Sequence, residues 1–192
     1  MRIAALKEQI LLKKSFLCVG LDIDLDKVPE HIKTMPDPLF EFSKAIIDAT
    51  AAFAVAYKPN IAFFETYGPE GMGSLKKAMD YLNEHHPEIF TIADAKRGDI
   101  GNTATRYAKA YFETYNFDSI TVAPDMGKDS VEPFLNFDEK YAIVLALTSN
   151  AGSSDFQTQE VGGQMLYEKV IQTSRDWKGS ERLMYVVGAT KA

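Results

Sequence analysis

Six short apolar runs alternate with stretches of helical periodicity along the 192 residues of this chain. The runs predict strands at 16–22, 54–60, 90–95, 119–123, 142–148 and 183–188. The stretches between them predict helices near 38–52, 70–85, 102–115, 128–136 and 161–176. The strand runs are mostly apolar on both faces, as is typical of a parallel sheet that helices cover. Because no Gly/Ser linker interrupts the alternation, we predict one α/β domain over residues 1–192.

Polar residues gather where each predicted strand ends. Asp22, Lys58 and Asp94 end the first three strands, and Thr148-Ser149-Asn150 follows the fifth. The active site of a (β/α)8 barrel is built from these carboxyl ends, although an open doubly wound sheet also binds its ligand there. The turn after the first strand, Gly20–Asp24, is not a glycine-rich phosphate loop. The pattern therefore favours a (β/α)8 TIM-type barrel, of which about six of the eight strand–helix units can be counted.

The segment from Asp94 to Thr103 carries the most chemistry. Alternation along the preceding strand puts Phe90, Ile92, Asp94 and Lys96 on one face, and the small residues Thr91, Ala93 and Ala95 on the other. Gly98 then bends the chain, Asp99 follows, and 101–103 opens a helix. Two carboxylates thus surround one ammonium at a strand end, which indicates either a chemical site or a structural ion pair.

Composition narrows the class of protein. A formal charge of −6 without a basic stripe argues against a nucleic-acid-binding surface. The single cysteine, Cys18, lies in an apolar run and is predicted to be a buried core thiol. The histidines lack metal-ligand spacing. No apolar run reaches membrane-spanning length and the first residues are unlike a signal peptide, so we predict a cytoplasmic protein.

The spacing Asp-x-Lys-x-x-Asp-Ile/Val-Gly-x-Thr, met without a gap from Asp94 to Thr103, is highly specific. With it, the segments 19–22, 58–65, 126–130, 147–152 and 186–190 resemble the longer bacterial branch of the orotidine 5′-monophosphate decarboxylase family. The resemblance implies a carboxy-lyase that converts orotidine 5′-monophosphate (OMP) to uridine 5′-monophosphate (UMP), the last step of de novo pyrimidine synthesis, without a cofactor or a metal.

The resemblance also implies a role for each matching residue. Lys96 would donate a proton to C6 of the pyrimidine, and Asp94 would lie beside the departing carboxylate. Asp99 and Thr103 would reach across a homodimer interface into the partner's site. Asp22 and Lys58 would bind ribose hydroxyls, and Ser149 would bind the pyrimidine edge.

Two other hypotheses stay open at this point. A metal-dependent sugar-phosphate lyase or aldolase of the same barrel group shares the Asp-x-Lys-x-x-Asp spacing, although 100–103 and 148–150 favour the decarboxylase. The second is a non-catalytic fragment. The family that this sequence resembles closes its barrel with two further strands, and the loops after those strands bind the 5′-phosphate. The present chain stops after its sixth predicted strand. We therefore expect an incomplete barrel that lacks about its C-terminal quarter, and low activity of the chain by itself.

Overall fold

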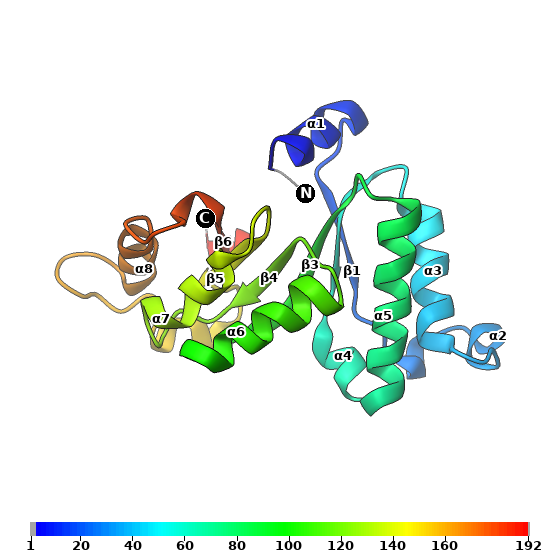
Figure 1. Cartoon of the computed structure of the whole chain (residues 1–192). Coiled ribbons are helices and arrows are strands. Elements are labelled where there is room, and N and C mark those ends of the chain that lie inside the picture. Colours follow the sequence, from blue (N-terminus) through cyan, green and yellow to red (C-terminus); the bar gives the residue numbers. More distant parts are fainter. Residues whose placement is uncertain (1–2, 192) are drawn as a thin grey trace. The chain divides into compact units, whose positions relative to one another are not determined.

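The computed structural model describes residues 3–191 and divides the chain into two compact units (Figure 1). The first unit holds the chain up to Ala95 together with Ala110–Asp118. The second holds Lys96–Lys109 together with the chain from Ser119 onward. The single domain over 1–192 stays a prediction, because two compact units can belong to one domain or to two.

The first unit contains three parallel strands and the helices that connect them. Strand β1 pairs with β2 and β2 with β3, with Gly20 opposite Lys58 and Ala56 opposite Phe90. Its elements in chain order are α1 (Ile3–Lys13), β1 (Leu17–Leu21), a 3₁₀ turn (Leu25–Lys27), α2 (Glu30–Lys33), α3 (Pro38–Thr50), β2 (Ala54–Pro59), α4 (Ile61–Glu65), α5 (Gly68–His85), most of β3 (Phe90–Arg97) and a π-helical turn (Ala110–Thr114).

The second unit also has three parallel strands in chain order, with Thr121 of β4 opposite Ile143 of β5 and Val144 of β5 opposite Tyr185 of β6. Its elements are the last two residues of β3, α6 (Gly101–Lys109), β4 (Ser119–Val122), α7 (Lys128–Val131), a 3₁₀ turn (Glu132–Asn136), β5 (Tyr141–Leu147), a 3₁₀ turn (Ala151–Asp155), α8 (Leu166–Ser174), a 3₁₀ turn (Ser180–Arg182), β6 (Leu183–Val187) and a 3₁₀ turn (Ala189–Lys191).

All six predicted strands are present, and most predicted helices begin where the sequence indicates. Helix α3 starts at Pro38, and the side chain of Asp37 caps it by accepting a hydrogen bond from the Phe40 amide. The helix predicted over 161–176 begins only at Leu166, because Gly162 and Gly163 have φ of +65° and +85° and cannot belong to a right-handed helix. The short helices α2 and α4 were not predicted.

Burial also departs from the prediction at two strands. Strands β2, β4 and β5 are almost wholly buried, as expected for a covered parallel sheet, whereas most of β1 and β6 is exposed or half-exposed. In the described part of the chain, β1 and β6 each pair along one edge only. Cys18 lies on β1 and is exposed, so the predicted buried core thiol is wrong.

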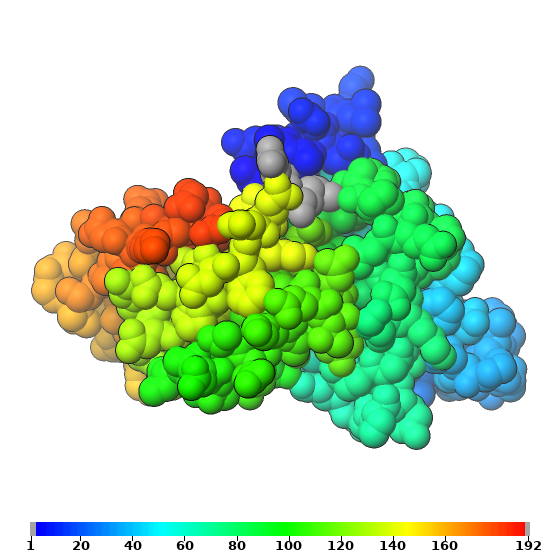
Figure 2. Space-filling model, viewed as in Figure 1, coloured from blue at the N-terminus to red at the C-terminus, as the bar shows by residue number. Residues whose placement is uncertain are grey.

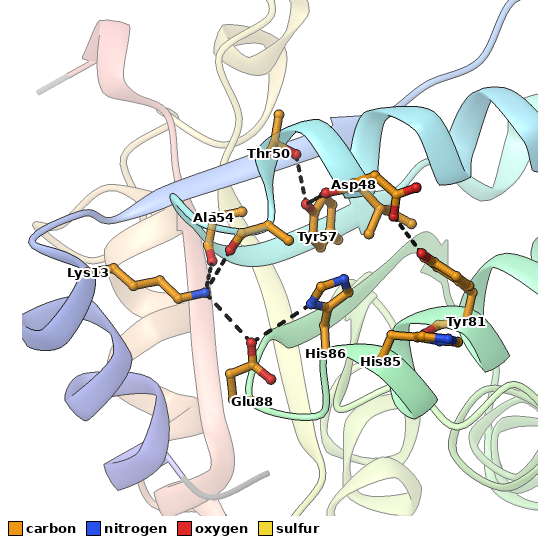
Figure 3. A network of polar contacts seen from close by, with 11 residues as sticks. Lys13, Asp48, Thr50, Ala54, Tyr57, Tyr81, His85, His86 and Glu88 are labelled. Atoms are coloured by element: carbon orange, nitrogen blue, oxygen red, sulfur yellow. Dashed lines mark hydrogen bonds and ion pairs between the residues drawn. The ribbon is translucent and has the colours of Figure 1, made fainter.

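Helix α1 has no buried residue, and its last residue, Lys13, makes polar contacts with the rest of the first unit (Figure 2, dark blue). The side chain of Lys13 is 12% exposed, and its ammonium donates to the carbonyls of Ala51 and Ala54 at 2.8 and 2.9 Å (Figure 3). The Glu88 carboxylate lies 3.9 Å from Lys13 and 4.0 Å from His86. This network ties α1 to the amino end of β2 and to the loop before β3, and leaves the carboxyl ends of these strands for the site.

Candidate active site

The carboxyl ends of β1, β2 and β3 bring three of the predicted site residues together in the first unit. The ammonium of Lys58 lies 2.8 Å from Oδ2 of Asp94. Asn60 forms an isolated bridge with Asp94 and donates through Nδ2 to Oδ2 of Asp22 at 3.3 Å. Strand register explains the cluster, because in-register residues of neighbouring parallel strands point to the same face.

Lys58 is held in its charged form. Burial acts to lower the pKa of its ammonium, but the hydrogen bond to Asp94 and the negative charges of Asp94 and Asp22 outweigh burial and raise the pKa. The side chains of Lys58 and Asp94 are 33% and 11% exposed. The pair is therefore a fixed, partly desolvated array of charge at the strand ends.

Asn60 is a site residue that the prediction left out. It links Asp22 after β1 to the end of β3, through its side chain and its backbone respectively. Its position two residues after Lys58, at the end of a strand, was the available signal. An amide there can hold a carboxylate in place without adding charge.

Lys96 begins the second unit and has an unusual backbone. Its φ is +48°, the left-handed region, although it lies within β3. For a residue with a side chain this conformation costs about 1–2 kcal/mol, which the surrounding structure must offset. The Lys96 amide donates to Oγ1 of Thr121 on β4 at 2.9 Å, and the Lys96 side chain is exposed.

The alternation predicted for β3 holds as far as Ala95. Thr91, Ala93 and Ala95 are buried, as predicted for the face with small residues. Alternation assumes extended backbone, and the chain leaves that conformation at Lys96. The alternation of side chains along a strand therefore could not predict the backbone turn at Lys96.

Asp99 and Thr103 follow in the second unit at the entry to α6. The Asp99 carboxylate accepts a hydrogen bond from the Ile100 amide at 2.7 Å, and Thr103 is exposed in the first turn of the helix. Helix α6 begins at Gly101, as predicted. Gly98 lies so near β4 that a β-carbon on it would be 3.2 Å from that of Ala123, which explains glycine at the bend.

Ser149 lies after β5 in a loop that other side chains hold in place. The Thr148 amide donates to Oε1 of Gln157 at 2.7 Å, and the Thr148 hydroxyl lies 2.6 Å from Oδ1 of Asn150. Ser149 itself is exposed. Gln157, which the sequence reasoning missed, thus anchors the residue next to Ser149.

A largely apolar cavity of about 600 Å³ lies beside this loop within the second unit. Gln157 lines it, so the same side chain contacts both the cavity and Thr148. The other lining residues come from β5, α8 and the loops that follow β4 and β5: Ala123, Pro124, Asp125, Gly127, Leu145, Ala146, Phe156, Leu166, Tyr167 and Val170.

Two features are absent from residues 3–191. No group of three or more His, Cys, Asp or Glu residues in that range is arranged to hold a metal ion. None of the helices described there is long and apolar enough to cross a membrane.

Comparison with known proteins places the chain in a family. The model of the orotidine 5′-phosphate decarboxylase / HUMPS family matches residues 15–192. The chain is 66% identical over 187 residues to the orotidine 5′-phosphate decarboxylase of Flavobacterium johnsoniae, with 97% of this chain and 68% of that protein covered. It is 64% identical, also over 187 residues, to the enzyme of Christiangramia forsetii, with 97% and 69% covered.

Solved structures agree with the sequence matches. The OMP decarboxylase of Leishmania donovani superposes with a TM-score of 0.86 and 39% identity, covering 98% of this chain and 70% of that one. An OMP decarboxylase described as putative, from Toxoplasma gondii, gives a TM-score of 0.87 with 33% identity, covering 97% and 70%. These matches confirm the predicted barrel class, with six strand–helix units in the described residues. The chain is a member of the orotidine 5′-phosphate decarboxylase / HUMPS family.

Proposed function

We propose that this chain carries the decarboxylation of OMP to UMP, a carboxy-lyase step in pyrimidine nucleotide synthesis. The observation that carries the proposal is the Lys58–Asp94 ion pair, 2.8 Å long, at the end of the strand that also bears Lys96. Relatives that share about two thirds of this sequence are named for this reaction. The metal-dependent lyase of the same barrel group is not favoured, because those high-identity relatives are all decarboxylases.

The chemistry requires a fixed positive charge near the reacting carbon. When the bond between C6 and the carboxylate breaks, carbon dioxide leaves and the electron pair remains on C6, where the ring offers no good electron sink. A cation already in place stabilises this charge as it develops. Lys96 fills that role and then transfers its proton to C6, which forms the new C–H bond.

The remaining charges serve the same step. Asp94 lies beside the departing carboxylate and, with Asp99, provides negative charge that directs the Lys96 ammonium. Lys58 and Asp22 bind the ribose hydroxyls, and Ser149 donates to the pyrimidine edge. The contacts that support these roles are the ion pair of Asp94 with Lys58 and the hydrogen bond that holds Asp22.

Asp99 and Thr103 act across the interface of a homodimer. Support comes from their place at the entry of α6, where Thr103 and Ile100 are exposed and available to a second copy. The cytoplasm is the proposed compartment, because the substrate is a free nucleotide and one cysteine offers no internal disulfide.

A direct test uses an active protein that contains this chain. Lys96→Ala should reduce kcat to less than about a tenth of the parent's value and leave the protein folded, since removal of a charge that stabilises the transition state costs several kcal/mol. Lys109→Ala, at the end of α6, is the matched control and should retain full activity. An active Lys96→Ala variant would contradict the role given to Lys96.

Two further measurements separate the alternatives. Activity should survive EDTA; loss with EDTA and recovery with Mg²⁺ would favour the metal-dependent lyase. A thermal-shift titration of the 192-residue chain with UMP distinguishes a binding-competent site from a non-catalytic fragment, because a ligand that binds only the folded state raises the unfolding temperature.

A further inference from the structure

Lys96 has a backbone conformation that its surroundings must maintain. Four non-glycine residues between 3 and 191 have positive φ, and the other three, Lys14, Asn116 and Glu139, lie in turns or irregular segments. Lys96 alone among these four lies within a strand. Backbone strain at such a position is usually retained where it serves a function.

The hydrogen bond from the Lys96 amide to Thr121 joins β3 to a side chain of β4. In a parallel pair the amide of each second residue donates to a backbone carbonyl of the neighbouring strand. The Lys96 amide instead donates to the hydroxyl of Thr121 at 2.9 Å. At the next residue along β3, the Arg97 carbonyl accepts a hydrogen bond from the Ala123 amide at 2.9 Å.

The acceptor is rigid while the lysine side chain is exposed. Thr121 is 4% exposed, and its strand β4 is buried along its whole length and paired with β5 through Ile143. A β-branched side chain also has few rotamers, so its hydroxyl has little freedom. The Thr121 side chain is thus fixed in the core, and its hydroxyl holds the backbone of an exposed lysine, Lys96.

We propose that Thr121 is a positioning residue for Lys96, whose hydroxyl keeps the lysine backbone in the left-handed conformation that directs the ammonium to the reacting carbon. The inference rests on the proposed function, in which Lys96 donates the proton. Thr121 contacts the backbone of Lys96, so its loss should lower the maximum of kcat against pH without moving the profile along the pH axis.

The test compares Thr121→Ser with Thr121→Ala in an active protein that contains this chain. Both variants remove the methyl group, but only alanine also removes the hydroxyl. We expect kcat of the alanine variant to be about 10 to 100 times lower than that of the serine variant, with KM within about threefold, since a misplacement near 1 Å costs up to about 100-fold. Equal kcat values in the two variants would overturn the proposal.

Thr91 supplies the matched control. It is a buried threonine on β3, 1% exposed, whose hydroxyl accepts from the Asp118 amide at 2.9 Å and donates to its carboxylate at 3.0 Å. Thr91→Ser and Thr91→Ala should differ in thermal stability but not in kcat. A similar fall in kcat in the Thr91 pair would mean that general loss of stability explains the Thr121 result.

Hydrogen exchange separates this inference from the proposed function. The Lys96 amide should exchange at least about ten times faster in Thr121→Ala than in Thr121→Ser, because the acceptor is lost. If the parent protein does not decarboxylate OMP, the proposed function fails, and the exchange measurement still decides whether Thr121 holds Lys96. Equal exchange rates would show that it does not.

Discussion

The ammonium of Lys58 lies 2.8 Å from Oδ2 of Asp94, and the Asp94 side chain is the more buried of the two. Lys58→Met should destabilise the chain by about 2 kcal/mol and Asp94→Asn by about 1 kcal/mol, because each substitution removes one partner of a partly buried ion pair. Both losses should be smaller than for a fully buried pair, because the two side chains are partly exposed. Urea unfolding of both variants and of the double variant measures the coupling. The double variant should lose about 1 kcal/mol less than the sum, and strict additivity would mean that the pair contributes no interaction energy.

The proposed homodimer, in which Asp99 acts in the site of the partner subunit, leads us to expect complementation between two inactive variants. Lys96→Ala subunits mixed and re-equilibrated with Asp99→Ala subunits form heterodimers with one intact and one doubly defective site. Random exchange between two-fold symmetric dimers should therefore restore roughly a quarter of the parent's active sites. The measurement is activity after mixing, with subunit exchange verified by mass. Exchange without recovered activity would place Asp99 in the site of its own subunit.

Replacing Gly188 by alanine should lower the stability of the protein, whereas the same substitution within a helix usually raises it. A β-carbon at Gly188 would lie 3.0 Å from both the amide nitrogen and Cα of Ser149, so Gly188→Ala must displace the backbone of a proposed substrate-binding residue. We expect a loss of about 1–3 kcal/mol in unfolding free energy and a higher KM. Gly73→Ala is the control, since Gly73 lies in α5 with no atom near its β-position, and it should gain about 0.5–1 kcal/mol. Unchanged stability and KM in Gly188→Ala would show that the loop moves freely.

The Asp37 carboxylate should make the stability of the first unit depend on pH. Burial acts to raise the pKa of its carboxyl, but hydrogen bonds from Lys77, Ser74 and the Phe40 amide outweigh burial and lower the pKa. A lowered folded-state pKa stabilises the protein above the unfolded value near pH 4, and this stability is lost as pH falls through the lower folded-state pKa. Asp37→Asn should therefore cost about 1 kcal/mol at pH 6 and progressively less below about pH 4.

Chemical denaturation between pH 3 and pH 7 measures this difference. Asp80→Asn is the matched control, because Asp80 pairs with Lys76 on the exposed face of α5, where its side chain is 56% exposed. Exposed pairs within a helix contribute about 0.3–0.5 kcal/mol, so the control should show a small difference. A cost for Asp37→Asn that stays constant through pH 3 would contradict the role of its charge.

Local patterns were enough to locate the strands and the motif. An apolar run between turn residues is a property of neighbouring residues, so each of the six predicted strands appears where expected. The start of α3 at Pro38 and of α6 at Gly101 follows from the same local chemistry. The motif from Asp94 to Thr103, on which the family resemblance rests, is likewise a pattern within one segment of the sequence.

Positions that depend on distant partners were not predicted. Cys18 is exposed because β1 pairs along one edge in the described residues, and an apolar run does not say how many partners a strand has. The contact of Asn60 with Asp22 joins residues 38 apart, through the register of β1 and β2. Register depends on the packing of whole strands and not on a pattern within one of them.

Lys96 shows the division most clearly. The placement of a lysine between two aspartates at the end of a strand can be read from one segment of the sequence. Its φ of +48° and the hydrogen bond from its amide to Thr121, 25 residues further along the chain, arise only when the strands pack. Side-chain alternation follows from extended backbone alone, whereas a strained conformation exists only where a partner from elsewhere in the fold offsets its cost.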